Sequence, residues 1–185
     1  MKRIKTADEE HLRRVATHEA GHAVYEWVSP CFLNVLRVTI RPNCRGNLGE
    51  SQFLQKSELS LLSELVDSIA SRLAGIVAEK MFGYEPSTGA HGDLDSATRI
   101  AKTMVLECGM GQRVGNRVID DDEHVSDRLR DDVDRDIRQI LKLGRWLAKR
   151  TLRAYQGEIG AVVELLMEHK TIYEVALEEV LGPKA

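Results

Sequence analysis

The chain has 185 residues, of which 43% are hydrophobic and 30% are charged, and its 26 basic and 29 acidic residues give a formal charge of −3. This composition is typical of one globular domain, here residues 1–185, and it excludes disordered, fibrous and membrane-embedded classes. Because the chain has no net positive charge to attract phosphates, we do not expect nucleic acid as a partner.

The first predicted element is a helix over residues 6–28. Thr6 and Glu9 have the spacing of a capping box, in which the two side chains satisfy free N–H groups at a helix start. Apolar residues then recur three or four positions apart, and Pro30 prevents the helix from continuing. The pattern predicts a long N-terminal helix with one buried face.

A small β-hairpin is predicted next, followed by a second long helix. Residues 35–40 and 50–54 are β-branched or alternate in polarity, and a glycine-rich turn separates them. Leucine and isoleucine then recur at helical spacing over residues 57–82, and Gly83 suits the position just after a helix end. A loop over residues 84–92 is expected to connect this helix to the next one.

The second half of the chain is predicted to be helical. One helix covers residues 94–108, and an acidic block at residues 120–123 opens the longest helix, whose later residues are basic, as the helix dipole favours. Two helices follow, one over residues 158–169 and one that begins at a capping box formed by Thr171 and Glu174. The sequence therefore indicates a mainly α fold with a small β-hairpin or short sheet.

No segment is apolar over the roughly 20 residues that a membrane-spanning helix needs. The basic start is followed by polar residues instead of the apolar core of a secretion signal. Cys31, Cys44 and Cys108 are odd in number and far apart, which argues against a disulfide framework. We therefore expect a cytoplasmic protein without a membrane span.

An H-E-x-x-H motif, His18-Glu-Ala-Gly-His22, lies inside the first predicted helix. Four residues of helix rotate by about 400°, so both imidazoles leave the same face and can bind one tetrahedral ion. Glu19 projects to the side, where it can take a proton from water at a metal ion. Gly21 costs about 1 kcal/mol relative to alanine inside a helix, which indicates that another part of the chain approaches its backbone.

A hydrolytic zinc site needs a third protein ligand, and the third histidine of metzincins is absent after His22. Asp93, at the start of the helix after the loop, and Glu79, near the end of the long helix, are two candidates. His91, in the loop, is another candidate donor. Spacing does not choose among them, because an aspartate at such a helix start usually serves only as a cap.

Three segments resemble the FtsH family of zinc peptidases. Residues 15–24 are similar to its active-site helix, residues 73–79 to its Gly-Arg-x-Ala-Glu-Glu helix, and residues 87–93 to its S-T-G-A-x-N-D segment. The likeness runs in order from about Val15 to Leu181. It implies a helical, zincin-like peptidase domain of FtsH type.

The resemblance also implies a role for each residue of the site. The family's zinc ligands correspond to His18, His22 and Asp93, and its catalytic base corresponds to Glu19. Glu79 then has a supporting role and is kept as the reserve ligand.

The sequence departs from the family pattern in several places. Family members usually carry a transmembrane segment and an ATPase domain ahead of the peptidase, whereas the likeness here begins close to the first residue. The phosphate-binding motif G-x-x-x-x-G-K-[ST] does not occur, so we expect no ATPase in this chain. Thr17, Ile76 and Gly92 stand where the family usually has Tyr, Arg and Asn, which implies differences around the site.

The function implied by the resemblance is that of a zinc metalloendopeptidase acting on flexible or unfolded protein segments. An extended protein or peptide substrate could pair with the edge of either hairpin strand. Two alternatives stay open: a non-catalytic zinc-binding module associated with a separate ATPase, and a hydrolase of non-peptide amides. Family likeness also implies a homo-oligomer, commonly a hexamer.

Overall fold

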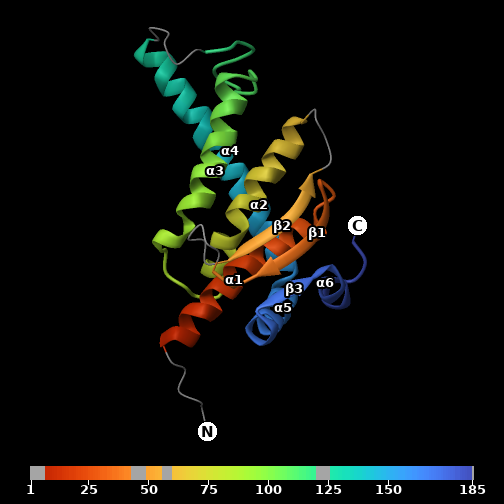
Figure 1. The fold of residues 1–185 in the computed structure, drawn as a ribbon. Helices are drawn as coiled ribbons and strands as arrows, with labels where there is room; N and C mark the ends of the chain where they lie inside the picture. The colour runs from red at the N-terminus through yellow and green to blue at the C-terminus, as the bar shows by residue number, and fades with distance from the viewer. Residues whose placement is uncertain (1–6, 43–48, 56–59, 120–125, 185) are drawn as a thin grey trace.

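A computed structural model describes residues 7–42, 49–55, 60–119 and 126–184 (Figure 1). Its elements in chain order are α1 (Ala7–Val28), β1 (Phe32–Thr39), β2 (Glu50–Gln55), α2 (Leu62–Met81), the short 3-10 helix η1 (Thr88–Ala90), α3 (His91–Leu106), α4 (Asp127–Ala154), α5 (Gln156–His169), β3 (Thr171–Tyr173) and α6 (Glu174–Leu181). The predicted mainly α fold with a short sheet is therefore confirmed.

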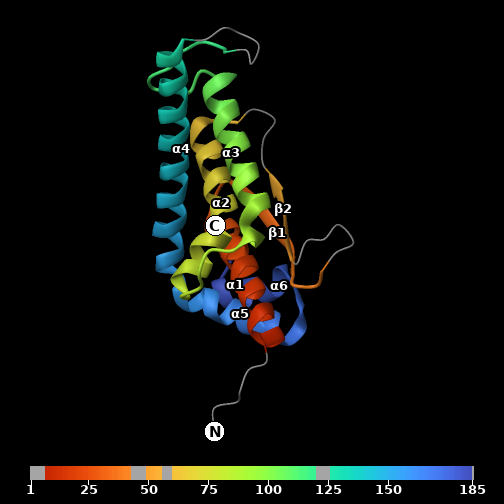
Figure 2. The ribbon, with the colours of Figure 1, turned by 90° about the vertical axis from the view of Figure 1, so that its left-hand side faces the viewer.

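The helices pack mainly around α2, which contacts α1, α3 and α4. Figure 2 shows α4 and the sheet on opposite sides of the molecule, with α1, α2 and α3 between them. Buried residues of α1, α2, α4 and α5 join buried residues of β1 in one apolar core. The first helix therefore lies within this core and is not a surface helix.

The burial of α1 exceeds what its sequence pattern predicts. From Val15 to Trp27 every residue is buried apart from His18, which is half-buried. The buried residues include the polar side chains of Thr17, Glu19, His22 and Glu26. Burying polar groups without partners is costly. These four side chains therefore indicate that this part of α1 contains a functional site.

Gly21 lets α1 and α2 approach closely. A Cβ atom at this position would lie 2.6 Å from the Cβ of Ala78 and 2.8 Å from the carbonyl oxygen of Ala74. The sequence predicts that another part of the chain approaches the backbone at Gly21. The structure identifies this part as α2.

Within the described residues the sheet has three antiparallel strands in the order β2-β1-β3, so β1 is central and β2 and β3 are its edges. The sequence predicts a hairpin or a short sheet, but no strand at residues 171–173. Residues 171–173 form the third strand, in which Thr171 pairs with Thr39. The hydroxyl oxygens of these two threonines are 2.8 Å apart. The expected capping box of Thr171 and Glu174 is wrong, because Thr171 is used by the sheet and the N-cap of α6 is Tyr173.

Several helix starts also differ from the predicted ones. Helix α2 begins at Leu62, and the residues just before it, 60 and 61, are not helical. Helix α3 begins at His91, three residues earlier than predicted, so Asp93 lies in its first turn. Helix α4 begins at Asp127, where the Ser126 hydroxyl accepts a hydrogen bond from the backbone N–H of Leu129 at 3.3 Å.

Some sequence predictions fall outside the described residues. These are the capping residue Thr6, Cys44, most of the predicted hairpin turn, and the acidic block at residues 120–123. Among the described residues, no helix combines the length and the apolar character of a membrane span.

Candidate metal and catalytic site

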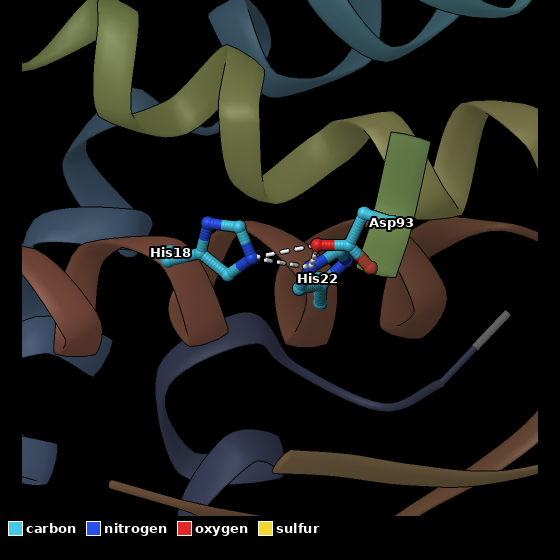
Figure 3. A group of neighbouring side chains, drawn as sticks. All are labelled: His18, His22 and Asp93. Atoms are coloured by element: carbon cyan, nitrogen blue, oxygen red, sulfur yellow. Dashed lines mark hydrogen bonds and ion pairs between the residues drawn. The ribbon is translucent and has the colours of Figure 1, made fainter. Parts of the chain in front are cut away.

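His18 and His22 extend from one face of α1 toward Asp93 of α3 (Figure 3). The Nε2 atom of His18 lies 2.8 Å from Oδ2 of Asp93, and Nε2 of His22 lies 3.3 Å from the same oxygen. The two Nε2 atoms are 3.1 Å apart. Three side chains from two helices thus direct one donor atom each to one point.

Local structure explains this convergence. The four-residue spacing of the histidines places their side chains one above the other on α1. Helix α3 starts at His91, and its first turn delivers Asp93 to the same place from the other side. The early start of α3 therefore positions the carboxylate, which a loop would hold less firmly.

The second ring nitrogen of each histidine also has a partner. Nδ1 of His22 donates to the backbone carbonyl oxygen of Ser71 at 2.8 Å, and Nδ1 of His18 lies 2.7 Å from Oε1 of Glu79. Since a carbonyl can only accept, Nδ1 of His22 carries a proton, which leaves Nε2 as the ring nitrogen that could bind a metal ion. Such outer partners fix the orientation of histidines that bind metals.

Glu79 is held in place on the far side of the His18 ring from Asp93. Its Oε2 atom accepts a hydrogen bond from Nε of Arg14 at 2.6 Å. Burial raises the pKa of Glu79, but the hydrogen bond from His18 and the charge of Arg14 outweigh this and lower it. Glu79 is thus an ionised partner of His18 and lies outside the group of converging donors.

The donors fit a zinc ion. The two imidazole nitrogens and the carboxylate oxygen all lie within 4.8 Å of one another. Zinc–ligand bonds of about 2.0–2.2 Å in a tetrahedral site place neighbouring donors about 3.3–3.6 Å apart, close to the spacings observed. A Cβ atom at Gly75 would lie 2.6 Å from Nε2 of His22 and 2.7 Å from Nε2 of His18, so only glycine leaves this space free.

The electrostatic environment favours a cation among these donors. Burial lowers the pKa of His18, but hydrogen bonds to Asp93 and Glu79 outweigh it and raise the pKa to about 10. Burial raises the pKa of Asp93, but the charges and hydrogen bonds of the two histidines hold it well below its usual range. The same negative charges that retain a proton on His18 would attract a metal ion.

Glu19 lies beside this group and is only 7% exposed. Burial raises the pKa of Glu19 to about 7, although the charges of His22 and His18 act against this shift. A carboxylate with a pKa near neutrality can both accept and return a proton. A Cβ atom at Gly49 would lie 2.6 Å from Oε1 of Glu19, so the backbone just before β2 adjoins this carboxylate.

His91, the remaining candidate donor, is exposed and does not belong to the converging group. Sequence reasoning assigned no role in the site to Ser71, Gly75 or Gly49. The Ser71 contact with His22 uses a backbone carbonyl, which leaves no signal in the residue type. The role of the two glycines depends on packing between elements that only the fold brings together.

Comparisons with known proteins give a consistent result. The model of the family described as Peptidase family M41 matches residues 5–180. The ATP-dependent zinc metalloprotease FtsH of Rhodothermus marinus is 31% identical over 194 aligned residues, which cover 99% of this chain and 28% of that protein. FtsH of Thermotoga maritima is 29% identical, covering 98% of this chain and 32% of that protein.

The ATP-dependent zinc metalloprotease FtsH 3 of Sphaerobacter thermophilus is 32% identical, and the match covers 92% of this chain and 35% of that protein. The chain thus spans 28% to 35% of the length of these three relatives. The comparisons confirm the resemblance that the three sequence segments indicate.

Proposed function

The chain belongs to peptidase family M41, and the relatives that it resembles are named zinc metalloproteases. We propose that the chain is a zinc-dependent endopeptidase. Its substrates are flexible or unfolded protein segments. The observation that carries the proposal is the convergence of His18, His22 and Asp93 beside the buried carboxylate of Glu19. A metal-dependent hydrolase needs this combination of a cation site and an adjacent base.

In this proposal His18, His22 and Asp93 hold zinc, which supplies Lewis-acid chemistry for hydrolysis at neutral pH. Glu19 accepts a proton from the attacking water molecule and later donates it to the amine that leaves. Glu79 and the Ser71 carbonyl keep the two imidazoles oriented. Burial of Glu19 and His22 limits the access of bulk water to these groups.

We propose that the substrate docks along β2. An extended peptide can add as a strand to a free sheet edge, where main-chain hydrogen bonds hold it with little dependence on sequence. Of the two hairpin strands, β1 is paired on both sides, so it is not available, whereas β2 is an edge. The approach of the Gly49 backbone to Glu19 supports docking at β2, because it brings this edge next to the base.

Replacement of the base tests the proposal. We predict that Glu19→Gln lowers cleavage of unfolded casein by at least about 10³-fold, because the amide cannot accept the proton. Zinc content should stay at one ion per chain, since Glu19 is not a ligand. Casein cleavage and metal analysis of the same preparations measure both effects. An active Glu19→Gln variant, or a zinc-loaded wild type without activity toward any unfolded protein, contradicts the proposal; the second result favours a non-catalytic zinc module.

The relatives are named ATP-dependent, whereas residues 1–185 contain no G-x-x-x-x-G-K-[ST] motif. We propose that any ATP-driven unfolding of substrates comes from outside these residues, for example from an ATPase partner, and that the chain acts in the cytoplasm. The free cysteines Cys31 and Cys108 support a reducing location. The oligomeric assembly of the family is proposed for this chain by likeness alone.

A further inference from the structure

Glu26 is a buried acid that the proposed reaction does not use. It lies four residues after His22 on α1, one turn farther along the same face, and is 1% exposed. Its Oε1 atom accepts a hydrogen bond from the hydroxyl of Ser71 on α2 at 2.7 Å. Its Oε2 atom accepts one from the hydroxyl of Ser51 on β2 at 2.9 Å.

Both serines connect Glu26 to the site. Ser71 is the residue whose backbone carbonyl accepts the Nδ1 proton of His22. Ser51 is the second residue of β2, the edge strand whose start adjoins Glu19. The carboxylate of Glu26 therefore contacts two elements of the proposed site. One is the residue whose carbonyl orients His22, and the other is the strand that we propose binds the substrate.

Stability alone does not explain an acid at this position. The neighbours Val24, Tyr25 and Trp27 are all buried, and an apolar side chain at position 26 would avoid the cost of removing a carboxylate from water. Buried polar networks are often neutral or unfavourable compared with apolar packing, but they fix the relative positions of the groups they join.

We propose that Glu26 is a positioning residue, which holds β2 through Ser51 and the His22-supporting turn of α2 through Ser71. This inference rests on the proposed function, because it assigns β2 to the substrate and His22 to the metal. Loss of the Ser51 contact releases the strand and weakens substrate binding. Loss of the Ser71 contact loosens the backbone carbonyl that orients His22 and weakens metal binding.

Four variants test the two branches separately: Ser51→Ala, Ser71→Ala, Glu26→Ala and, as a matched control, Asp136→Asn. Asp136 is a buried acid on α4, 2% exposed, that accepts hydrogen bonds from the backbone N–H groups of Arg113 and Val114. These residues follow the C-terminal end of α3, whereas Asp93 lies at its N-terminal end. The control thus removes a buried charge far from the site.

The measurements are KM and kcat for an unfolded peptide substrate, the zinc dissociation constant from competition with a chelator, and the melting temperature. Ser51→Ala should raise KM about 3- to 10-fold, the factor expected for one lost hydrogen bond, with the zinc dissociation constant unchanged. Ser71→Ala should raise the zinc dissociation constant about 3- to 10-fold with KM unchanged. Glu26→Ala should do both, and Asp136→Asn should lower the melting temperature without either effect.

The inference is overturned if Glu26→Ala lowers the melting temperature as Asp136→Asn does but leaves KM and the zinc dissociation constant within twofold of wild type. If Glu26→Ala does not fold, the two serine variants decide, and wild-type values in both overturn it. If the wild type cleaves no peptide, the proposed function fails. The zinc dissociation constants of Ser71→Ala and Glu26→Ala then still support or overturn the link to His22.

Discussion

At the scale of single residues, the site depends on where side chains are absent as well as on where they are present. In the proposed function the histidines, Asp93 and Glu19 supply the chemistry, and Gly75 leaves the space in which the two Nε2 atoms face Asp93. Gly49 likewise leaves the space occupied by the carboxylate of Glu19. These glycines are required for clearance from neighbouring side chains.

Gly75→Ala tests this requirement. Its Cβ atom would lie within 2.7 Å of both imidazoles, which must then shift from the positions in which they face Asp93. We predict a zinc dissociation constant at least about tenfold higher, measured by chelator competition. Gly160→Ala in α5 is the matched control, because a Cβ atom there meets nothing within 4 Å. It should leave zinc binding unchanged and raise the free energy of unfolding by up to about 1 kcal/mol. Equal zinc affinity in the two variants contradicts the requirement for Gly75.

Residue types predict only part of this site. His18, Glu19 and His22 could be recognised because their chemistry follows from spacing within one helix. Asp93, Glu79 and His91 could not be ranked by spacing, since the third donor comes from a separate helix; the family resemblance favoured Asp93. The geometry brings Asp93 to both imidazoles and gives Glu79 a contact with the other side of His18.

At the scale of elements, α1 carries the site, and its C-terminal end is stabilised by the last residues of the chain. The helix has no basic residue in its last turn. Nζ of Lys184 donates to the carbonyl oxygens of Glu26, Trp27 and Ser29 at 2.9, 2.8 and 3.2 Å. A cation at the negative end of the helix dipole satisfies carbonyl groups that the helix leaves free.

We predict that Lys184→Met lowers the free energy of unfolding by about 1–2 kcal/mol, because three carbonyl groups lose a charged donor. Urea denaturation measures this change. Lys149→Met on the exposed face of α4 is the control and should change the same quantity by less than about 0.5 kcal/mol. If the two variants are equally stable, the contacts of Lys184 do not stabilise α1.

Helices and strands could be predicted where the periodic pattern of apolar residues is long, and they were missed where it is short. The helices α1, α2 and α5 could be predicted from their periodicity, although α1 is buried around its circumference from Val15 to Trp27. Strand β3 has three residues, too few for a pattern of alternation, and its partner β1 lies far away in the sequence. The start of α3 was missed because the S-T-G-A-H segment contains residues typical of loops.

At the scale of the whole molecule, the site joins helices that are distant in the sequence. His18 and His22 belong to α1 and Asp93 to α3, while α2 supplies the outer hydrogen bonds from Ser71 and Glu79. A metal ion at this point would bind only the folded arrangement, because the unfolded chain does not bring these groups together. Metal binding should therefore stabilise the entire fold.

We predict that zinc at 100 times its dissociation constant stabilises the folded chain by about 2.7 kcal/mol and that a chelator reverses this effect. Thermal denaturation with and without zinc measures the change as a shift in melting temperature. Glu19→Gln should retain the shift, whereas Asp93→Ala should lose most of it. A zinc-dependent shift of wild-type size in Asp93→Ala means that the ion binds elsewhere.

The most direct test of the account is a crystal structure of the zinc-loaded protein with anomalous diffraction data at the zinc edge. We predict one ion bound by Nε2 of His18, Nε2 of His22 and a carboxylate oxygen of Asp93 at about 2.0–2.2 Å, with Glu19 beside its open position. An ion held by Glu79 in place of Asp93, or Asp93 turned away from an ion bound by the two histidines, would contradict it.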